Sequence, residues 1–278
     1  MNRLSAFRSV PRAALIPALI GVGLVVGPLL ALCVNIPLAD LPQLWTDPAT
    51  VQSVRLSLTT SLIATVACAV LGLPLALVLT KVLTKVPRGS AISSVLSAAI
   101  FAPVILSPVV SGLALIFFWG RASAIGSWLY SAGYAVAFTP AAVVLTQIFV
   151  GLPFFVATAV TTLRAIPVEF EEIAYVEGAT PAEITAKVLL PLAAPGLATG
   201  LLLAFARALG EYGATVTFAG NIAGATRTIP LNIELLLGSN DLNGALGSSL
   251  LLISLYLLIL GAAILVLVFR RIRQGRPA

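Results

Sequence analysis

Six long apolar segments divide the chain and constrain its fold more than any other feature of the sequence. A helix needs about 20 mostly apolar residues to cross the hydrocarbon core of a bilayer. Only 9% of the 278 residues are charged and 59% are hydrophobic, whereas soluble domains carry about 25% charged residues. The sequence therefore predicts an all-α integral membrane protein of about six transmembrane helices, in one domain over residues 1–278. The expected spans are Ala13–Val34, Leu56–Thr80, Ile92–Trp119, Ala135–Leu163, Gly196–Phe218 and Ser248–Phe269.

Basic residues between these spans predict the orientation of the chain. Cytoplasmic loops carry an excess of Lys and Arg. Twelve basic residues fall on one side of the predicted spans and three on the other, which places both termini in the cytoplasm of a multi-pass protein of the cell membrane. The first span is longer than the core of a signal peptide, so we expect it to be retained. The twelve are Arg3, Arg8, Arg12, Lys81, Lys85, Arg88, Arg164, Lys187, Arg270, Arg271, Arg273 and Arg276, and the three are Arg55, Arg121 and Arg227.

Several kinds of chemistry are excluded by what the sequence lacks. There is no histidine, which removes the commonest general base and metal ligand. Cys33 and Cys68 lie inside apolar segments, so we expect neither a metal site nor a disulfide framework. No lysine is followed by Ser or Thr, so the phosphate-binding loop of ATPases is absent. We therefore expect no catalytic residue and no cofactor in this chain, and we interpret the net charge of +6 as loop charge and not as a nucleic-acid surface.

The loop over residues 164–195, between the fourth and fifth spans, holds half of the ten acidic residues. A first short helix is expected to have Pro167 in its first turn and to end at Gly178, which can adopt the left-handed conformation. Thr180 and Glu183 fit a capping box that starts a second short helix, and Pro191 is expected after its end. The acidic residues are Glu169, Glu171, Glu172, Glu177 and Glu183.

The composition of this loop allows two interpretations. An amphipathic hairpin lying on the membrane usually carries Lys and Arg on its polar face. This loop is acidic instead, which favours an element that docks into a groove of a protein partner.

The same loop resembles a motif of ABC-importer permeases. The family pattern is E-A-A, three residues, G, nine residues and I-x-L-P. This chain has the same spacing, with Glu172-Ile173-Ala174, Gly178, Val188 and Leu190-Pro191. Ile173 and Val188 are small apolar departures from the pattern. The resemblance implies the type I ABC-importer permease fold, with ATP on a separate ATPase subunit. It also implies ATPase-coupling roles for Glu172, Ala174, Gly178, Leu190 and Pro191.

Two further stretches resemble the molybdate and sulfate permeases. Residues 205–215 are similar to their A-R-x-x-G-E-[FY]-G-[AS] stretch, and residues 221–230 to the N-I-x-G-x-T-R-T-I-P segment of the molybdate type. The resemblance implies import of molybdate, with tungstate as a similar cargo and sulfate or thiosulfate as the alternative. The implied partners are a second copy of the chain, two ATP-binding cassette ATPases and an extracytoplasmic oxyanion-binding protein, with lipid around the spans.

Within the fifth predicted span, Arg207 and Glu211 lie four residues apart and can pair on one helix face. Ionisable groups at membrane depth are candidates for function, so Arg207 could offset the charge of a crossing dianion. The pair could instead lock the fifth helix to a neighbour, and we favour this because a partnered arginine offers less net field. Asn221 is either at the outer mouth or an ordinary turn residue beside Gly220.

Two other classes of protein remain as alternatives. Ion-coupled secondary transporters commonly use intramembrane acids as relays, and here Glu211 is the only such acid. A membrane scaffold without transport activity is the second. The E-A-A spacing counts against both, since neither needs a docking loop for an ATPase.

Overall fold

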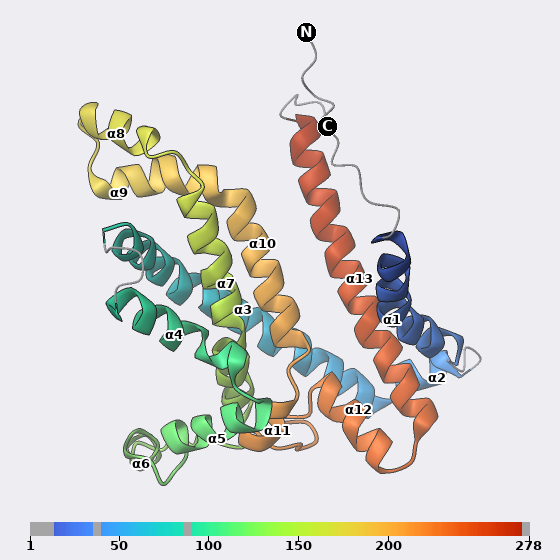
Figure 1. Ribbon diagram of the computed structural model, residues 1–278. Helices are drawn as coiled ribbons and strands as arrows, with labels where there is room; N and C mark the ends of the chain where they lie inside the picture. The colour runs from blue at the N-terminus through green and yellow to red at the C-terminus, as the bar shows by residue number, and fades with distance from the viewer. Residues whose placement is uncertain (1–13, 36–39, 86–90, 274–278) are drawn as a thin grey trace.

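The computed structural model describes residues 14–35, 40–85 and 91–273, and all regular structure in these ranges is helical. Three long helices, α3 (Pro48–Lys85), α7 (Pro140–Arg164) and α10 (Leu190–Leu209), pack against one another in the middle of the molecule. Figure 1 shows α8 (Glu169–Val176) at one end of this bundle, and the C-terminal end of α13 (Leu242–Arg273) at the same end. Arg3, Arg8, Arg12, Arg88 and Arg276, which entered the predicted orientation, lie outside the described residues.

The remaining helices surround this centre. α5, α6, α11 and α12 lie at the end opposite α8 (Figure 1). No residue of α1 is buried. The bounds are α1 (Leu15–Val34), α2 (Leu41–Thr46), α4 (Ala91–Ile105), α5 (Pro108–Trp119), α6 (Ala124–Ser131), α9 (Pro181–Glu183), η2 (Ile184–Leu189), α11 (Gly213–Phe218) and α12 (Ile229–Gly238).

Five helices in the described part of the chain are long and apolar enough to cross a membrane, and the pair α5–α6, bent by 54°, would be a sixth. The predicted all-α membrane fold is thus confirmed. Two predicted spans, however, are wrong as single helices. The third is broken between α4 and α5, because Pro108 cannot continue the backbone hydrogen bonding of a helix and Ser107 is extended at φ −62° and ψ 148°. The fifth is broken between α10 and α11.

The contact of α3, α7 and α10 is built around Phe155, whose side chain is 2% exposed. A Cβ on Gly72 of α3 would lie 2.6 Å from Cδ1 of this ring, and one on Gly200 of α10 would lie 3.2 Å from Cδ2. Two glycines therefore form a notch that lets both helices approach the ring. Small residues commonly allow such close approach in membrane bundles, where packing replaces the hydrophobic effect between helices.

Toward the end opposite α8, buried polar contacts replace apolar packing. Gln147 of α7 donates its Nε2–H to Ser61 Oγ of α3 over 3.2 Å, and Ser57 Oγ accepts the N–H of Ile229 at 2.8 Å. These bonds tie α3 to α7 and to the start of α12.

The notch around Phe155 predicts a specific cost for one added methyl group. Gly72→Ala should lower stability by about 1–3 kcal/mol, because the ring has no free space into which to move. Gly261→Ala in α13 is the matched control, since nothing lies within 4 Å of its added Cβ. Thermal denaturation of the purified proteins in detergent measures the stability of both variants. Equal melting temperatures for the two variants would show that the notch is not tight.

Candidate functional site

α8 ends in a glycine corner of the Schellman type. Gly178 has φ +83°, and its N–H bonds to the carbonyl of Tyr175 at 3.0 Å. The N–H of Ala179 reaches back to the carbonyl of Ala174, also at 3.0 Å. These two bonds satisfy carbonyls that the end of a helix leaves without a partner. The predicted left-handed glycine is confirmed, whereas Pro167 precedes the first turn, because Val168 is the N-cap residue.

The predicted capping box after this corner is also confirmed. Thr180 Oγ1 accepts the N–H of Glu183 at 3.3 Å, and the Glu183 carboxylate accepts the N–H of Thr180 at 3.1 Å. Lys187 Nζ lies 2.8 Å from the same carboxylate. Because both bonds of the box are made, the direction in which the chain leaves the corner is fixed by the residues of the corner itself.

The second short helix does not stop before Pro191, and this part of the prediction is wrong. α9, η2 and α10 form one helix over Pro181–Leu209. The η2 segment is a π-helical turn, in which the N–H of Leu190 bonds to the carbonyl of Thr185, five residues back. In an ordinary helix a proline ring clashes with the carbonyl four residues earlier. The wider turn directly before Pro191 gives that ring room, so the helix continues into the span.

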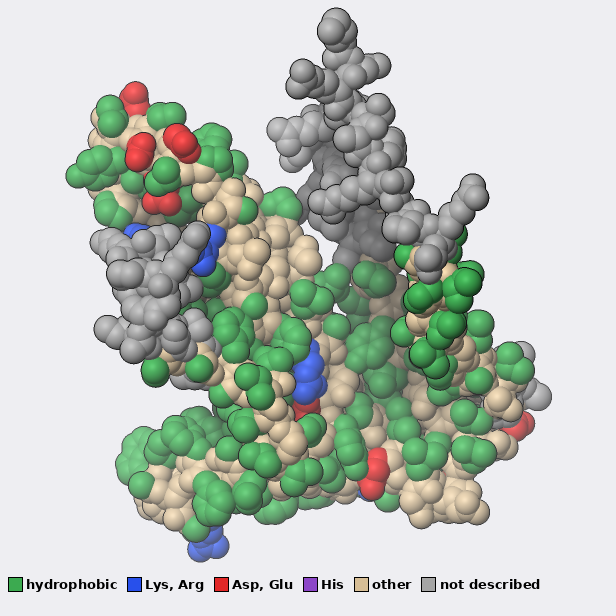
Figure 2. All heavy atoms as spheres, in the orientation of Figure 1, with side chains coloured by type: hydrophobic (Ala, Val, Ile, Leu, Met, Phe, Trp, Pro, Cys, Tyr) green, Lys and Arg blue, Asp and Glu red, His purple; other side chains and the backbone are tan. Residues whose placement is uncertain are grey.

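α8 presents an acidic and apolar surface at the tip of the molecule, where Figure 2 shows acidic side chains gathered. Glu172 is exposed, as are the apolar side chains of Phe170, Ile173 and Tyr175, each at least 47% exposed. Ala174 faces the other way and packs with Ala179 against the core cluster that contains Ile184 and Leu189. The underside of α8 is therefore anchored, and its outer surface is free to contact a partner.

The five predicted coupling residues fall in two places. Glu172, Ala174 and Gly178 lie in α8 and its corner, where Glu172 lines a cavity of about 590 Å³ between α8 and the following helix. Leu190 and Pro191 lie in the first turn of α10. The structure does not bring these two groups together at one surface, but the helix from Pro181 joins them rigidly.

Arg207 and Glu211 form an ion pair, with 2.5 Å between Arg207 Nη1 and Glu211 Oε2. The other carboxylate oxygen, Glu211 Oε1, accepts the N–H of Ala214 at 2.9 Å, at the start of α11. The Glu211 side chain is 2% exposed and that of Arg207 is 33% exposed. The glutamate thus satisfies a backbone donor at the break between α10 and α11, and the arginine balances its buried charge.

Arg207 also lines a cavity of about 180 Å³. The cavity lies where the α4–α5 break meets α7 and α10, and its other lining residues are mostly apolar: Pro103, Val104, Leu106, Pro108, Ser111, Val150 and Phe154. One face of the guanidinium therefore serves the ion pair, while another part borders this cavity, which is named the central cavity because α7 and α10 of the middle bundle contribute to its lining.

Three residues of this centre escaped the sequence analysis. Ser107 caps α5 by accepting the N–H of Val110 at 3.3 Å, and the Ser-Pro pair that begins α5 is an N-terminal signature that hydropathy alone overlooks. Tyr256 of α13 donates its hydroxyl to the Ala206 carbonyl at 3.2 Å. Gly213 contacts Pro108 so closely that an added Cβ would overlap the proline ring. For the last two no local pattern exists, because their partners are 50 or more residues away.

Asn221 serves as a structural residue of the loop between α11 and α12. Its Nδ2–H donates to the Leu231 carbonyl at 2.8 Å, and its Oδ1 accepts from Arg227 Nε at 2.9 Å. Buried Thr226 donates to the Gly220 carbonyl at 3.0 Å and accepts the N–H of Ile222 at 2.9 Å. The loop is therefore fixed by its own side chains.

Residues 72–274 match the family model described as the binding-protein-dependent transport system inner membrane component. The chain belongs to this family. The matched region contains the α8 corner, the break at Glu211 and every predicted span except the first and part of the second.

Several curated relatives of the chain are named as molybdenum or sulfate transport system permeases. It is 41% identical over 246 residues to the molybdenum transport system permease protein ModB of Mycobacterium tuberculosis, covering 87% of this chain and 89% of the relative. It is 40% identical over 163 residues to the probable sulfate transport system permease protein cysT of Nephroselmis olivacea, covering 58% of this chain and 57% of the relative. The resemblance to the molybdate and sulfate permeases, and most to the molybdate type, is confirmed.

Solved structures of ABC importers share the fold. The bacterial alginate ABC transporter, in complex with an alginate pentasaccharide-bound periplasmic protein, superposes with a TM-score of 0.69 at 18% identity, covering 90% of this chain and 91% of that one. The MetNI methionine ABC transporter superposes with a TM-score of 0.60 at 20% identity, covering 81% of this chain and 96% of that one. These likenesses confirm the predicted importer-permease fold.

The ion pair predicts unequal effects of single and double substitutions. Arg207→Ala leaves the buried Glu211 charge without a partner and should cost up to about 3 kcal/mol of stability, somewhat less than for a fully buried pair. Arg207→Ala combined with Glu211→Ala should be milder than the sum of the two single changes by about 0.5–3 kcal/mol. Thermal denaturation of the wild type, the two single variants and the double variant measures this coupling free energy between Arg207 and Glu211. A stable Arg207→Ala protein that assembles fully and fails only in transport would instead assign Arg207 to the pathway of the anion.

Proposed function

We propose that this chain is the membrane-spanning subunit of an ATP-driven importer that carries molybdate into the cytoplasm. It works as a homodimer, with two separate ATPase subunits and an extracytoplasmic oxyanion-binding protein that delivers the anion. The proposal is supported by the 41% identity to ModB permeases over most of both chains and by the absence of a phosphate-binding loop from the sequence.

The observation that carries the proposal is the form of the α8 corner. α8 offers exposed apolar and acidic side chains to a partner, and Ala174 holds it against the body of the permease. From Pro181 the chain continues as one helix to Leu209, which ends at the break beside Arg207 and Glu211. A partner that displaces α8 therefore acts directly on the helix that borders the central cavity, which is what coupling of ATP hydrolysis to transport requires.

Molybdate is favoured over sulfate because two mycobacterial ModB permeases are each aligned over 87% of the chain, whereas the sulfate permease is aligned over 58%. Tungstate has the same charge and shape, so we include it as a second cargo. Arg207 borders the cavity, but its pair with Glu211 keeps the net charge there low, so we assign the pair mainly to structure. Most of the selection among oxyanions is accordingly assigned to the binding protein.

The coupling role predicts two variants that insert normally but lose uptake. Gly178→Val opposes the positive φ that the corner requires, and Glu172→Lys reverses a charge on the docking surface. Both should bind the ATPase weakly and import little molybdate. The measurements are co-purification of the ATPase and uptake of labelled molybdate.

Matched controls come from the opposite end of the molecule. Gly133→Val places the same strain at φ +89° with nothing within 4 Å, and Glu234→Lys reverses an exposed charge on α12. Neither should affect ATPase association. If Gly178→Val and Glu172→Lys retain wild-type association and uptake, the coupling assignment fails, and the case for ATP-driven import fails with it.

The proposed orientation predicts opposite labelling of two positions. Single cysteines are introduced as Ser239→Cys, between α12 and α13, and as Arg273→Cys, in a chain without Cys33 and Cys68. In sealed cells an impermeant thiol reagent should label position 239 and leave position 273 unlabelled until the membrane is opened. Labelling of position 273 from outside would reverse the orientation.

A further inference from the structure

A cavity of about 520 Å³ lies at the end of the bundle opposite α8, between the C-terminal end of α5, α6 and residues 135–138. Its volume is within the range of small-molecule sites. The walls are formed mainly by apolar side chains, among them Ile116, Phe117, Trp119 and Val136. This cavity is separate from the α8 corner and from the space beside Arg207.

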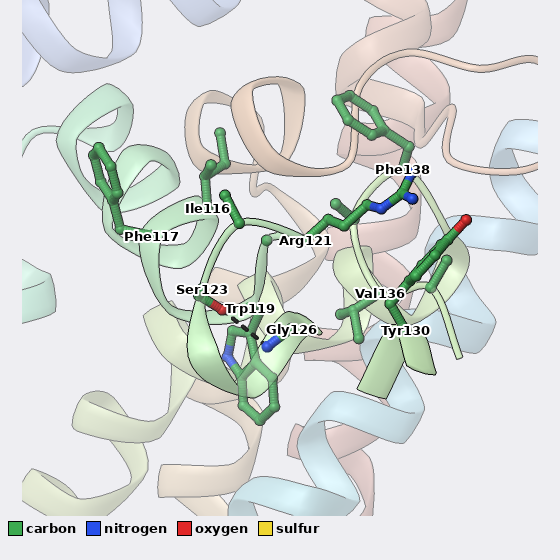
Figure 3. Close-up of a pocket in the computed structure, with 13 residues that line it drawn as sticks. Ile116, Phe117, Trp119, Arg121, Ser123, Gly126, Tyr130, Val136 and Phe138 are labelled. Carbon is green, nitrogen blue, oxygen red and sulfur yellow. Dashed lines mark hydrogen bonds between the residues drawn. The ribbon is translucent and has the colours of Figure 1, made fainter. Parts of the chain in front are cut away.

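Arg121 is the one charged residue that lines this cavity. Its guanidinium stacks over the ring of Tyr130, with 3.8 Å from Cζ to the ring centroid. Figure 3 shows the arginine side chain reaching across from the α5–α6 bend toward Tyr130 and Phe138. In the part of the chain that the structure describes, no carboxylate forms an ion pair with Arg121. Stacking on the ring fixes the position of the cation and leaves its charge uncompensated.

Phe138 is held at the rim of the cavity in an unusual conformation. Its φ is +62°, which is rare for a bulky residue. Its N–H bonds to the Phe218 carbonyl at 3.4 Å, and a Cβ on Gly220 would lie 3.1 Å from its ring. Contacts with α11 and the following loop therefore hold this aromatic side chain at the cavity, although it is 59% exposed.

The surroundings of the cavity have the composition of a membrane interface. Phe117 is 75% exposed, Trp128 68% and Tyr134 69%, and α6 leaves the direction of α5 at a bend of 54°. Trp and Tyr concentrate at the level of lipid headgroups, because their rings have an apolar body and a polar edge. An apolar cavity with one cation at the level of the lipid headgroups can bind an amphiphile that carries a negative charge.

We propose that this cavity binds an anionic phospholipid, with its phosphate on Arg121 and one acyl chain along Ile116, Phe117 and Val136. A free oxyanion fits poorly, because the walls are mainly apolar and Arg121 is the one charged side chain among them. A choline headgroup is disfavoured, because the guanidinium already occupies the Tyr130 ring. The site is independent of the proposed cargo and of the coupling role of α8.

The test uses Trp119 as a reporter, because it lines the cavity. Trp45→Phe and Trp128→Phe leave it as the only tryptophan of the chain. The permease, purified with its accompanying subunits, is reconstituted into phosphatidylcholine vesicles that contain a small fraction of acyl-brominated phosphatidylglycerol or acyl-brominated phosphatidylcholine. Bromine quenches indole fluorescence at short range. We expect brominated phosphatidylglycerol to quench Trp119 at about fivefold lower membrane fraction, the scale of one arginine near an anionic lipid surface.

Arg121→Gln should abolish this preference, and Arg121→Lys should keep most of it, because the charge is retained. Arg55→Gln is the matched control, since Arg55 is another exposed arginine predicted on the same side of the membrane as Arg121. The Arg55→Gln protein should keep the full preference for brominated phosphatidylglycerol. Tyr130→Leu removes the stacking ring and should weaken the preference in part, which gives a second reading if Arg121→Gln fails to fold.

Three results would overturn the proposal. Equal quenching by the two lipids would show that the headgroup is not recognised. Absence of quenching by either lipid would show that protein, such as a second copy of the chain or the binding protein, covers the cavity. A preference lost equally in Arg55→Gln would show that general surface charge, and not this cavity, attracts the lipid.

Discussion

A backbone group freed inside a bilayer finds no water to bond, so every break in a spanning helix needs a partner from the protein. The described part of this molecule has two such breaks, between α4 and α5 and between α10 and α11, and side chains bond backbone groups at both. Ser107 accepts a backbone N–H of α5 and Glu211 accepts one of α11, while Tyr256 adds a second hydrogen bond to the Ala206 carbonyl near the end of α10. The charge that Glu211 brings into the interior then requires Arg207. The ion pair is thus a consequence of the broken helix as well as a feature of the central cavity.

The repaired breaks also fix the elements to one another. Pro108 at the start of α5 lies directly against Gly213 at the start of α11, so the two breaks meet. At the other end, Ala174 and Ala179 hold the α8 corner against the core, and one helix runs from that corner to the α10–α11 break. The proposed docking surface and the central cavity are therefore connected through hydrogen-bonded helical structure.

The sequence predicted those features whose causes are local. The capping box of Thr180 and Glu183 and the left-handed Gly178 depend on residues within four positions of one another, and both are present. The span count followed from hydropathy, but hydropathy measures composition and not continuity, so the breaks at Ser107 and Gly210 were missed. Pro191 does not end the helix as predicted, because a π-helical turn can accommodate its ring. The contacts of Phe155 and Tyr256 join distant helices, and no local pattern specifies them.

The π-helical turn of η2 also fixes the rotational phase of the helix. Such a turn holds one residue more than an α-helical turn, and each residue of an α-helix advances about 100° around the axis and 1.5 Å along it. The side chains beyond Leu189, Arg207 among them, therefore face directions that an uninterrupted α-helix from Pro181 would not give them. The direction in which the guanidinium meets the central cavity is set in part by one extra residue, about 20 positions away, beside the proposed docking surface.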